Sequence, residues 1–532
     1  MSDFPSTTEL AARVSQGEIS ARDVTERALS AIDARDGQLN AVAIRLDKLA
    51  RQCADRVDRA VARGEDPGPL AGVPFTIKEC YHLSGTRHTL GREQLATRGN
   101  PESARTSPII ERLISAGAVP VAKTNLSQLM LLYETENPLY GRTNHPLRSD
   151  RSPGGSGGGD AAALVAGYGC FAIGTDMGGS IRQPAHSVGV TGFLPTSGRL
   201  ETRGIERIMP GMTPVALQPG VMGRCTDDIE AVMQVLSEDK KDGCFSPAWC
   251  PSTRSLGELK VGYWESDDYF PVCPTVRRAV RESVSRLRDL GVDVVEMSPP
   301  DHREVLHLYC AIFGSDGGQR IGEQLRGEQV DWRVKPLLRL SKLPRSVRNL
   351  IARVYEWFGD QRLAGILKHS YRCSASTLWQ LTEAIADFRQ EFFARMQSLG
   401  LDAVVTPPHA TVAFRHGGSN HMLPAAAYSM LANVLGAPAG VVPVTEVRED
   451  EESMTMGGSS QDGPKRPVAR ESVRSRTDRA ALDNLRGAAG LPCGVQVMAT
   501  PWRDAVALQL MDVLQSSRCE CRAAAELANA PL

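Results

Sequence analysis

The amino-acid sequence predicts an α/β fold in which helices cover both faces of a central, mixed β-sheet of many strands. The clearest observation is a strand–helix–strand unit, with the strand LKVGYW at 259–264 and the strand VDVVEM at 292–297. Such a crossover favours parallel pairing of its two strands. A helix at 109–115 precedes AVPVA at 118–122, and a helix at 377–399 precedes DAVVTPP. This alternation of helices and short apolar strands is typical of α/β proteins.

Length and composition indicate an ordinary globular chain. Its 532 residues suffice to bury a large core, and 61 Lys and Arg against 62 Asp and Glu give a net charge of −1. A nearly neutral chain has no overall attraction for a polyanion, so we expect no nucleic-acid partner. The twelve cysteines are scattered and favour reduced thiols. There is no secretory h-region and no apolar run of about 18 residues, so we expect a cytoplasmic protein.

Two segments depart from the general pattern. Residues 447–485 are polar, highly charged and poor in aromatic residues. Such a segment buries too little apolar surface to order itself, which predicts a disordered insertion. Residues 345–372 place Val347, Leu350 and Trp357 at helical spacing among several arginines. This pattern fits an amphipathic helix at a membrane surface and an ordinary surface helix equally well.

The segment 152–184, SPGGSGGGDAAALVAGYGCFAIGTDMGGSIRQP, is the most informative stretch. It lacks the GxxxxGK[ST] and GxGxxG spacings, which disfavours nucleotide binding. GGSGG at 154–158 formally matches a nucleophile elbow, but a polar loop precedes it where an elbow needs an apolar strand. Neither His186 nor His409 stands out as the base of a triad. Without HExxH or another ligand spacing, we expect no metal.

A lysine can replace histidine as the base that activates a serine, provided that burial lowers its pKa. Lys78 follows an apolar, strand-like run in GVPFTIKEC (72–80). Taken alone, this position is better explained as a lysine at the end of a strand with its ammonium group in water.

The longer motifs resemble those of the amidase signature family. GGSGGG and GTDMGGSIRQPA are similar to its serine- and glycine-rich signature, and GVPFTIKEC, NPLYGRTNHP (137–146) and GLPCGVQVMATPWRD (490–504) are similar to its other motifs. The resemblance extends from about residue 8 to 515, apart from the 447–485 insertion. It implies one amidase domain over 1–532.

Within that domain we expect N-terminal helices at 1–60 and a catalytic core at 72–230. By resemblance, Lys78 is the base, Ser156 is a bridging serine after a cis peptide bond, and Ser180 is the nucleophile. Members of the family usually carry a second serine after the bridging one, and here that position is Gly157. Because the three catalytic positions are intact, we expect a reduced or shifted rate rather than loss of activity.

The resemblance also implies an oxyanion hole around the nucleophile. Two glycines precede Ser180, so successive N–H groups can point at one oxygen. Asp176 and Arg182 are implied to brace this loop. The hole is expected to consist of the main-chain N–H groups of Met177, Gly178, Gly179 and Ser180.

The likeness is greatest to the branch of the family that hydrolyses fatty acid amides. It rests on LKVGYWESDDYFPVCPTVRRAV, FGSDGG (313–318), LGAPAGVVPVTEV (435–447) and MATPWRD. It implies N-acylethanolamines or primary fatty amides as substrates and a membrane-facing cap at 345–372. The residues expected along the substrate channel, which fit core positions equally well, are Met130, Leu131, Tyr133 and Trp502.

Three alternatives stay open. The first is a glutaminase-type component of an amidotransferase, which shares the signature. The second is a soluble amidase that acts on short-chain or aryl amides. The third is an inactive amidase fold that binds lipid, which the glycine at position 157 suggests. We expect no cofactor and a small amide partner of lipid type. A homodimer and peripheral contact with an intracellular membrane also stay open.

Overall fold

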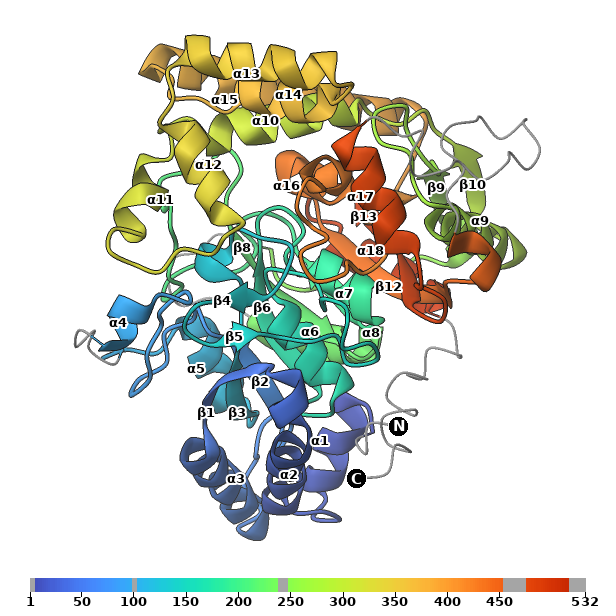
Figure 1. Ribbon diagram of the computed structural model, residues 1–532. Coiled ribbons are helices and arrows are strands. Elements are labelled where there is room, and N and C mark those ends of the chain that lie inside the picture. Colours follow the sequence, from blue (N-terminus) through green and yellow to red (C-terminus); the bar gives the residue numbers. More distant parts are fainter. Residues whose placement is uncertain (1–4, 98–102, 238–246, 453–474, 516–532) are drawn as a thin grey trace.

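The computed structural model describes residues 5–97, 103–237, 247–452 and 475–515, which form an α/β domain around one 11-stranded sheet (Figure 1). The strand order is β1-β3-β2-β6-β8-β7-β12-β13-β11-β9-β10. Strand β2 is parallel to β3 and β6, and β9 is parallel to β10 and β11, whereas the other pairs in the sheet are antiparallel. The predicted α/β fold with a mixed central sheet is therefore confirmed.

The strands of the large sheet are β1 (Val42–Arg45), β2 (Pro74–Lys78), β3 (Val119–Thr124), β6 (Phe171–Asp176), β7 (Thr191–Leu194), β8 (Gln218–Gly223), β9 (Lys260–Tyr263), β10 (Asp293–Glu296), β11 (Ala403–Thr406), β12 (Ala439–Glu446) and β13 (Pro492–Ala499). A separate hairpin consists of β4 (Glu136–Asn137) and β5 (Gly141–Arg142).

The α-helices of the described residues are α1 (Thr7–Ser15), α2 (Ala21–Leu39), α3 (Asp47–Ala62), α4 (Glu93–Thr97), α5 (Pro108–Ser115), α6 (Gly158–Val165), α7 (Arg182–Val188), α8 (Thr226–Leu236), α9 (Pro274–Asp289), α10 (His302–Phe313), α11 (Gln319–Gln324), α12 (Val334–Ser341), α13 (Arg345–Trp357), α14 (Gln361–His369), α15 (Ala375–Ser398), α16 (Ala427–Leu435), α17 (Arg476–Leu485) and α18 (Asp504–Leu514).

The β9–α9–β10 unit forms as its sequence pattern predicts. Helix α9 begins with Pro274 at its first turn, where the missing N–H costs no hydrogen bond. Its apolar positions, Val276, Val280 and Leu287 among them, are buried. Gly291 follows the helix with φ +84°, a conformation that suits glycine, and the chain turns into β10 beside β9.

Part of the segment expected to be disordered is a helix. Ser475 caps α17 by accepting a hydrogen bond from the Asp478 N–H, and Ala481, Leu482 and Leu485 are buried. Three apolar side chains on one helix face are enough to dock the segment on the core, although its overall composition is polar. The rest of the insertion, residues 453–474, lies outside the described residues.

The 345–372 segment forms α13 and α14, which lie with α10 and α15 at the top of Figure 1. Helix α13 buries Arg348 and Ala352, whereas Leu350 is 62% exposed and Trp357 is 83% exposed. Its apolar stripe therefore faces away from the core. In the described ranges, no helix is both long and apolar enough to cross a membrane.

Candidate active site

The carboxyl ends of two parallel strands bring the predicted site residues together. Strand β2 ends at Lys78 and its parallel neighbour β6 ends at Asp176, so both ends lie at the same edge of the sheet. The chain after β6 forms the loop that carries Ser180 and then enters α7. Ser156 comes from the turn before α6. Sites in α/β proteins commonly form where strand ends meet in this way.

Lys78 is fully buried and contacts the predicted bridging serine. Its Nζ lies 2.9 Å from Ser156 Oγ, 3.1 Å from Thr175 Oγ1 and 3.3 Å from the Thr175 carbonyl oxygen. Burial lowers the pKa of Lys78 from its ordinary value, although the negative charges of Asp160 and Asp176 oppose the shift. The residue pattern around Lys78 alone favours an ammonium group in water; the structure instead buries it against hydroxyl groups.

The peptide bond between Gly155 and Ser156 is cis, as the resemblance implied. The Gly155 N–H donates to Gln183 Oε1 at 3.0 Å, which fixes the turn from the α7 side. The main chains of the two serine segments also meet, because the Gly157 N–H donates to the Ser180 carbonyl oxygen at 3.2 Å. Ser156 and Ser180 line the same pocket.

A buried ion pair holds the loop that carries Ser180. Arg182 Nη2 lies 3.0 Å from Asp176 Oδ1, and neither side chain is exposed. The same guanidinium also donates to the Ser429 carbonyl oxygen and to the side chains of Gln496 and Asn433. Burial alone would raise the pKa of Asp176, but the pairing with Arg182 holds it below its ordinary value. The bracing role expected for this pair agrees with these contacts.

The four amides expected in the oxyanion hole differ in their bonding. The Gly179 N–H donates to Asp176 Oδ1 at 2.8 Å and is therefore already engaged. Within the described ranges, the N–H groups of Met177, Gly178 and Ser180 have no acceptor. Gly179 has φ +111°, and a Cβ there would lie 2.5 Å from the Ser429 side chain, so only glycine fits.

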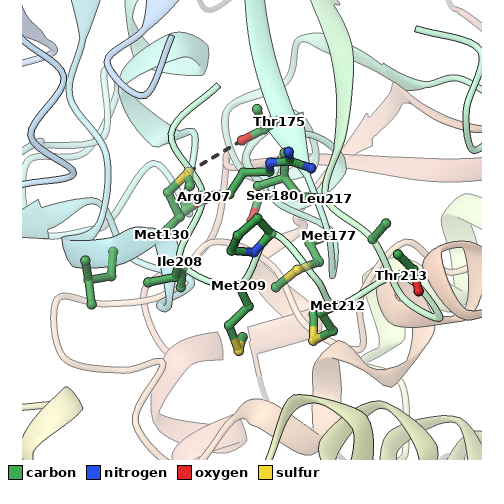
Figure 2. A pocket seen from close by; sticks show the side chains of 14 residues that line it. Met130, Thr175, Met177, Ser180, Arg207, Ile208, Met209, Met212, Thr213 and Leu217 are labelled. Atoms are coloured by element: carbon green, nitrogen blue, oxygen red, sulfur yellow. Dashed lines mark hydrogen bonds between the residues drawn. The ribbon is translucent and has the colours of Figure 1, made fainter. Parts of the chain in front are cut away.

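The pocket beside the serines has a volume of about 70 Å³ and is largely apolar. Figure 2 shows four methionines among the side chains around it. Met130 was expected from the sequence, and its sulfur lies 3.6 Å from Thr175 Oγ1. Much of the rest of the pocket wall comes from residues 207–217, a segment in which the sequence shows no motif. The lining residues from this segment are Arg207, Ile208, Met209, Pro210, Met212, Thr213, Ala216 and Leu217.

The other expected channel residues take different places. Tyr133 donates a hydrogen bond from its hydroxyl to the Gly178 carbonyl oxygen at 2.7 Å and so supports the nucleophile loop. Leu131 packs against the core. Trp502 is 43% exposed and lies under the guanidinium of Arg199, 5.3 Å from it. None of these three lines the pocket that holds Ser180.

The space around Gly157 is closed, so the missing serine leaves no gap. A Cβ at this position would lie 2.8 Å from the Ser180 carbonyl oxygen and 2.9 Å from Asp160 Oδ2. Asp160 is fully buried, Thr124 Oγ1 donates to its Oδ1, and its Oδ2 has no partner within the described ranges. Burial raises the pKa of Asp160 to about 7.

One cluster outside the pocket has the donor types of a metal site. Ligand atoms of His82, His88 and Glu206 lie within 4.8 Å of one another. The guanidinium of Arg92 also faces Glu206, at 3.9 Å. This cation competes for the carboxylate, so we interpret the cluster as a charge network and assign no metal to it.

Comparison with known proteins agrees with this arrangement. A family model described as Amidase matches residues 23–508. Fatty-acid amide hydrolase 1 of Sus scrofa is 32% identical over 452 residues, which cover 84% of this chain and 75% of that protein. A glutamyl-tRNA(Gln) amidotransferase component of Synechococcus sp. (strain WH7803) is 32% identical over 447 residues, which cover 81% of this chain and 88% of that protein.

Solved structures share the fold. A structure of fatty acid amide hydrolase superposes with a TM-score of 0.80 at 22% identity and covers 97% of this chain and 86% of that one. A bacterial aryl acylamidase superposes with a TM-score of 0.72 at 21% identity and covers 99% of both chains. The chain therefore belongs to the amidase signature family and is an amide hydrolase.

Proposed function

We propose that this protein hydrolyses fatty acid amides through an acyl-enzyme on Ser180. The observation that carries the chemistry is the buried contact between Lys78 Nζ and Ser156 Oγ at 2.9 Å. A lysine whose pKa is lowered by burial is neutral over a wider pH range and can accept a proton. The substrate class rests on the relatives that hydrolyse fatty acid amides.

The reaction runs in two halves. Neutral Lys78 accepts the Ser156 hydroxyl proton, and Ser156 accepts the Ser180 proton as Ser180 Oγ attacks the amide carbonyl carbon. The carbonyl oxygen becomes an oxyanion that accepts hydrogen bonds from the free main-chain N–H groups of the loop. The proton returns along the same path to the leaving amine as the C–N bond breaks. Water then attacks the ester, and Ser180 regains its proton.

The free amides of the loop suit the oxyanion. The N–H groups of Met177, Gly178 and Ser180 lack another acceptor among the described residues, so they are available for a developing negative charge. Loss of one such donor typically raises the barrier by about 2.7–4 kcal/mol. The Gly179 N–H holds Asp176 instead and keeps the loop in shape.

A long acyl chain requires the pocket to open. A volume of about 70 Å³ corresponds to roughly two water molecules. Methionine has three rotatable bonds and adapts its shape readily, so the side chains of Met130, Met209 and Met212 can move apart to admit a chain. The exposed apolar stripe of α13 supports a further proposal, that this helix contacts a membrane from which such substrates enter.

The test combines labelling with a substrate panel. A fluorophosphonate probe should label wild-type protein at Ser180 and should not label Ser180→Ala. The panel compares oleamide, N-oleoylethanolamine, a short aryl amide and glutamine. Hydrolysis of the first two above the others supports the proposal. Preference for glutamine would favour a glutaminase-type amidotransferase component, and correctly folded protein that neither labels nor turns over would favour an inactive lipid-binding fold.

A further inference from the structure

The pocket beside Ser180 contains one charged side chain, Arg207. The residues that line the pocket include no aspartate and no glutamate. Arg207 is partly buried, and in the part of the chain that the structure describes it has neither an ion pair nor a hydrogen bond. The neighbouring Glu206 is no partner for it, because that carboxylate faces His82 and Arg92. In Figure 2 the Arg207 guanidinium lies near the top with Ser180, whereas Met209 and Met212 lie at the bottom.

An arginine that lies in an apolar pocket and has no partner among the described residues calls for an explanation. A guanidinium does not lose its proton in proteins, so Arg207 keeps a positive charge at any working pH. Partial removal of that charge from water costs free energy unless an anion pairs with it. Two buried arginines of this chain follow that rule, whereas Arg151, which is fully buried, donates to main-chain carbonyl oxygens instead. Arg182 pairs with Asp176 at 3.0 Å, and Arg333 pairs with Asp331 at 2.7 Å.

We propose that Arg207 binds a carboxylate of the substrate and that the preferred substrates are N-acyl amino acids, such as N-acylglycines. This proposal rests on the proposed function, because it specifies which fatty amides react at Ser180. A fatty acyl chain is uncharged along its length, so the carboxylate belongs to the amine part of the substrate. The planar guanidinium presents its N–H donors in a fork that matches a carboxylate in two parallel hydrogen bonds.

The chemistry of the step is unchanged. Ser180 Oγ attacks the amide carbonyl, the C–N bond breaks, and the amino acid leaves as its amine takes the proton returned through Ser156 and Lys78. Arg207 holds the carboxylate of that amino acid and so orients the leaving nitrogen. An N-acylethanolamine of the same chain length leaves the guanidinium unpaired. A charged hydrogen bond of this kind corresponds to roughly a 10- to 100-fold preference.

The first measurement is kcat/KM for N-oleoylglycine and N-oleoylethanolamine, which differ chiefly in the carboxylate. Wild type should prefer N-oleoylglycine by roughly 10- to 100-fold. Arg207→Gln should abolish the preference, and Arg207→Lys should retain part of it. Arg203→Gln is the matched control, because Arg203 lies in the same segment, is 64% exposed and pairs with Glu201. Equal preference in wild type and Arg207→Gln would overturn the proposal.

The second measurement separates this proposal from the catalytic one. Binding of the two lipids to Ser180→Ala, measured by calorimetry, needs no turnover. N-oleoylglycine should bind more tightly than N-oleoylethanolamine, and the added Arg207→Gln change should remove the difference. If turnover fails but this difference stands, the proposed chemistry is wrong and the carboxylate site is supported. An Arg207-dependent preference for the monoamide of glutaric acid instead would place the carboxylate on the acyl side and overturn the N-acyl amino acid assignment.

Discussion

The burial of Lys78 ties the reaction to pH. Below its lowered pKa the amine is protonated and cannot accept the Ser156 proton, so kcat/KM should fall as pH decreases. Above that pKa the neutral form prevails and the rate should reach a plateau. Lys78→Ala should lose about 10²- to 10⁴-fold in kcat/KM at neutral pH, the usual contribution of a general base. A pH–rate profile of both proteins checks this, and a fully active Lys78→Ala would contradict it.

The residues around Gly157 leave no room for a side chain at this position. Gly157→Ser should lower the stability by about 1–3 kcal/mol and also lower kcat/KM, because its Cβ would press on the Ser180 carbonyl oxygen and on Asp160. Adding Asp160→Ala should recover part of the loss, as expected for two residues in contact. Denaturant unfolding measures the stability. Gly37→Ser is the control, since nothing lies within 4 Å of a Cβ there.

If Gly157→Ser were instead as stable as wild type and faster, the missing serine would be the limiting feature of the site. That outcome would agree with the family pattern, from which the missing serine is expected to reduce or shift the rate, and it would contradict the steric argument. The sequence shows which residue is absent, but the closure of the space around it depends on Ser180 and Asp160 meeting across a turn.

The sequence motifs predicted Lys78 and the two serines because each occurs in a long run of similar residues. Arg207 and Met209 could not be predicted in this way. They lie in a segment without periodicity or motif, and their approach to Ser180 depends on how that segment folds across the strand ends. The engagement of the Gly179 N–H by Asp176 is likewise a matter of loop geometry.

At the scale of elements, the junction of β6 and α7 depends on one buried ion pair. Arg182→Met would leave Asp176 buried and uncompensated, which should lower the stability by about 3–5 kcal/mol. Fluorophosphonate labelling of Ser180 should slow as well, because Asp176 also holds the Gly179 N–H and the Ile181 N–H.

An exposed pair provides the comparison for this junction. Arg281 pairs with Glu265 at 2.7 Å and is 54% exposed. Arg281→Met should change the free energy of unfolding by at most about 1 kcal/mol, because water screens such pairs. Similar effects of the two substitutions would show that the buried pair does not hold the loop.

The elements themselves were predictable where the apolar period was clear. The β9–α9–β10 unit formed with the expected parallel pairing. Helix α17 was not predicted, because a few buried apolar residues were outweighed by the charge of the surrounding segment. For α13 the sequence could predict a row of apolar residues on one helix face, but not that this face points away from the core. The buried positions turned out to be Arg348 and Ala352.

On the scale of the whole molecule, most of the large apolar side chains that are exposed lie within residues 332–379. Helices α13, α14 and α15 lie at the top of Figure 1, while α1, α2 and α3 lie at the opposite end. Large apolar side chains exposed on this upper part include Leu350, Val354, Trp357, Phe358 and Trp379. Large exposed apolar side chains that gather on neighbouring helices often mark contact with a membrane or another protein. We expect a membrane, because arginines such as Arg345 and Arg353 flank the stripe and suit anionic lipids.

Flotation with vesicles tests this expectation. Wild-type protein should float with vesicles of phosphatidylcholine and phosphatidylserine, and less with phosphatidylcholine alone. The double variant Leu350→Ser/Trp357→Ser should remain with the soluble fraction, because it removes the two most exposed side chains of the α13 stripe. Leu290→Ser is the control, since Leu290 is 43% exposed just after α9. Wild-type protein that stays soluble with both vesicles would refute membrane contact, and a dimer in sedimentation that the double variant dissociates would assign the stripe to a second copy of the chain.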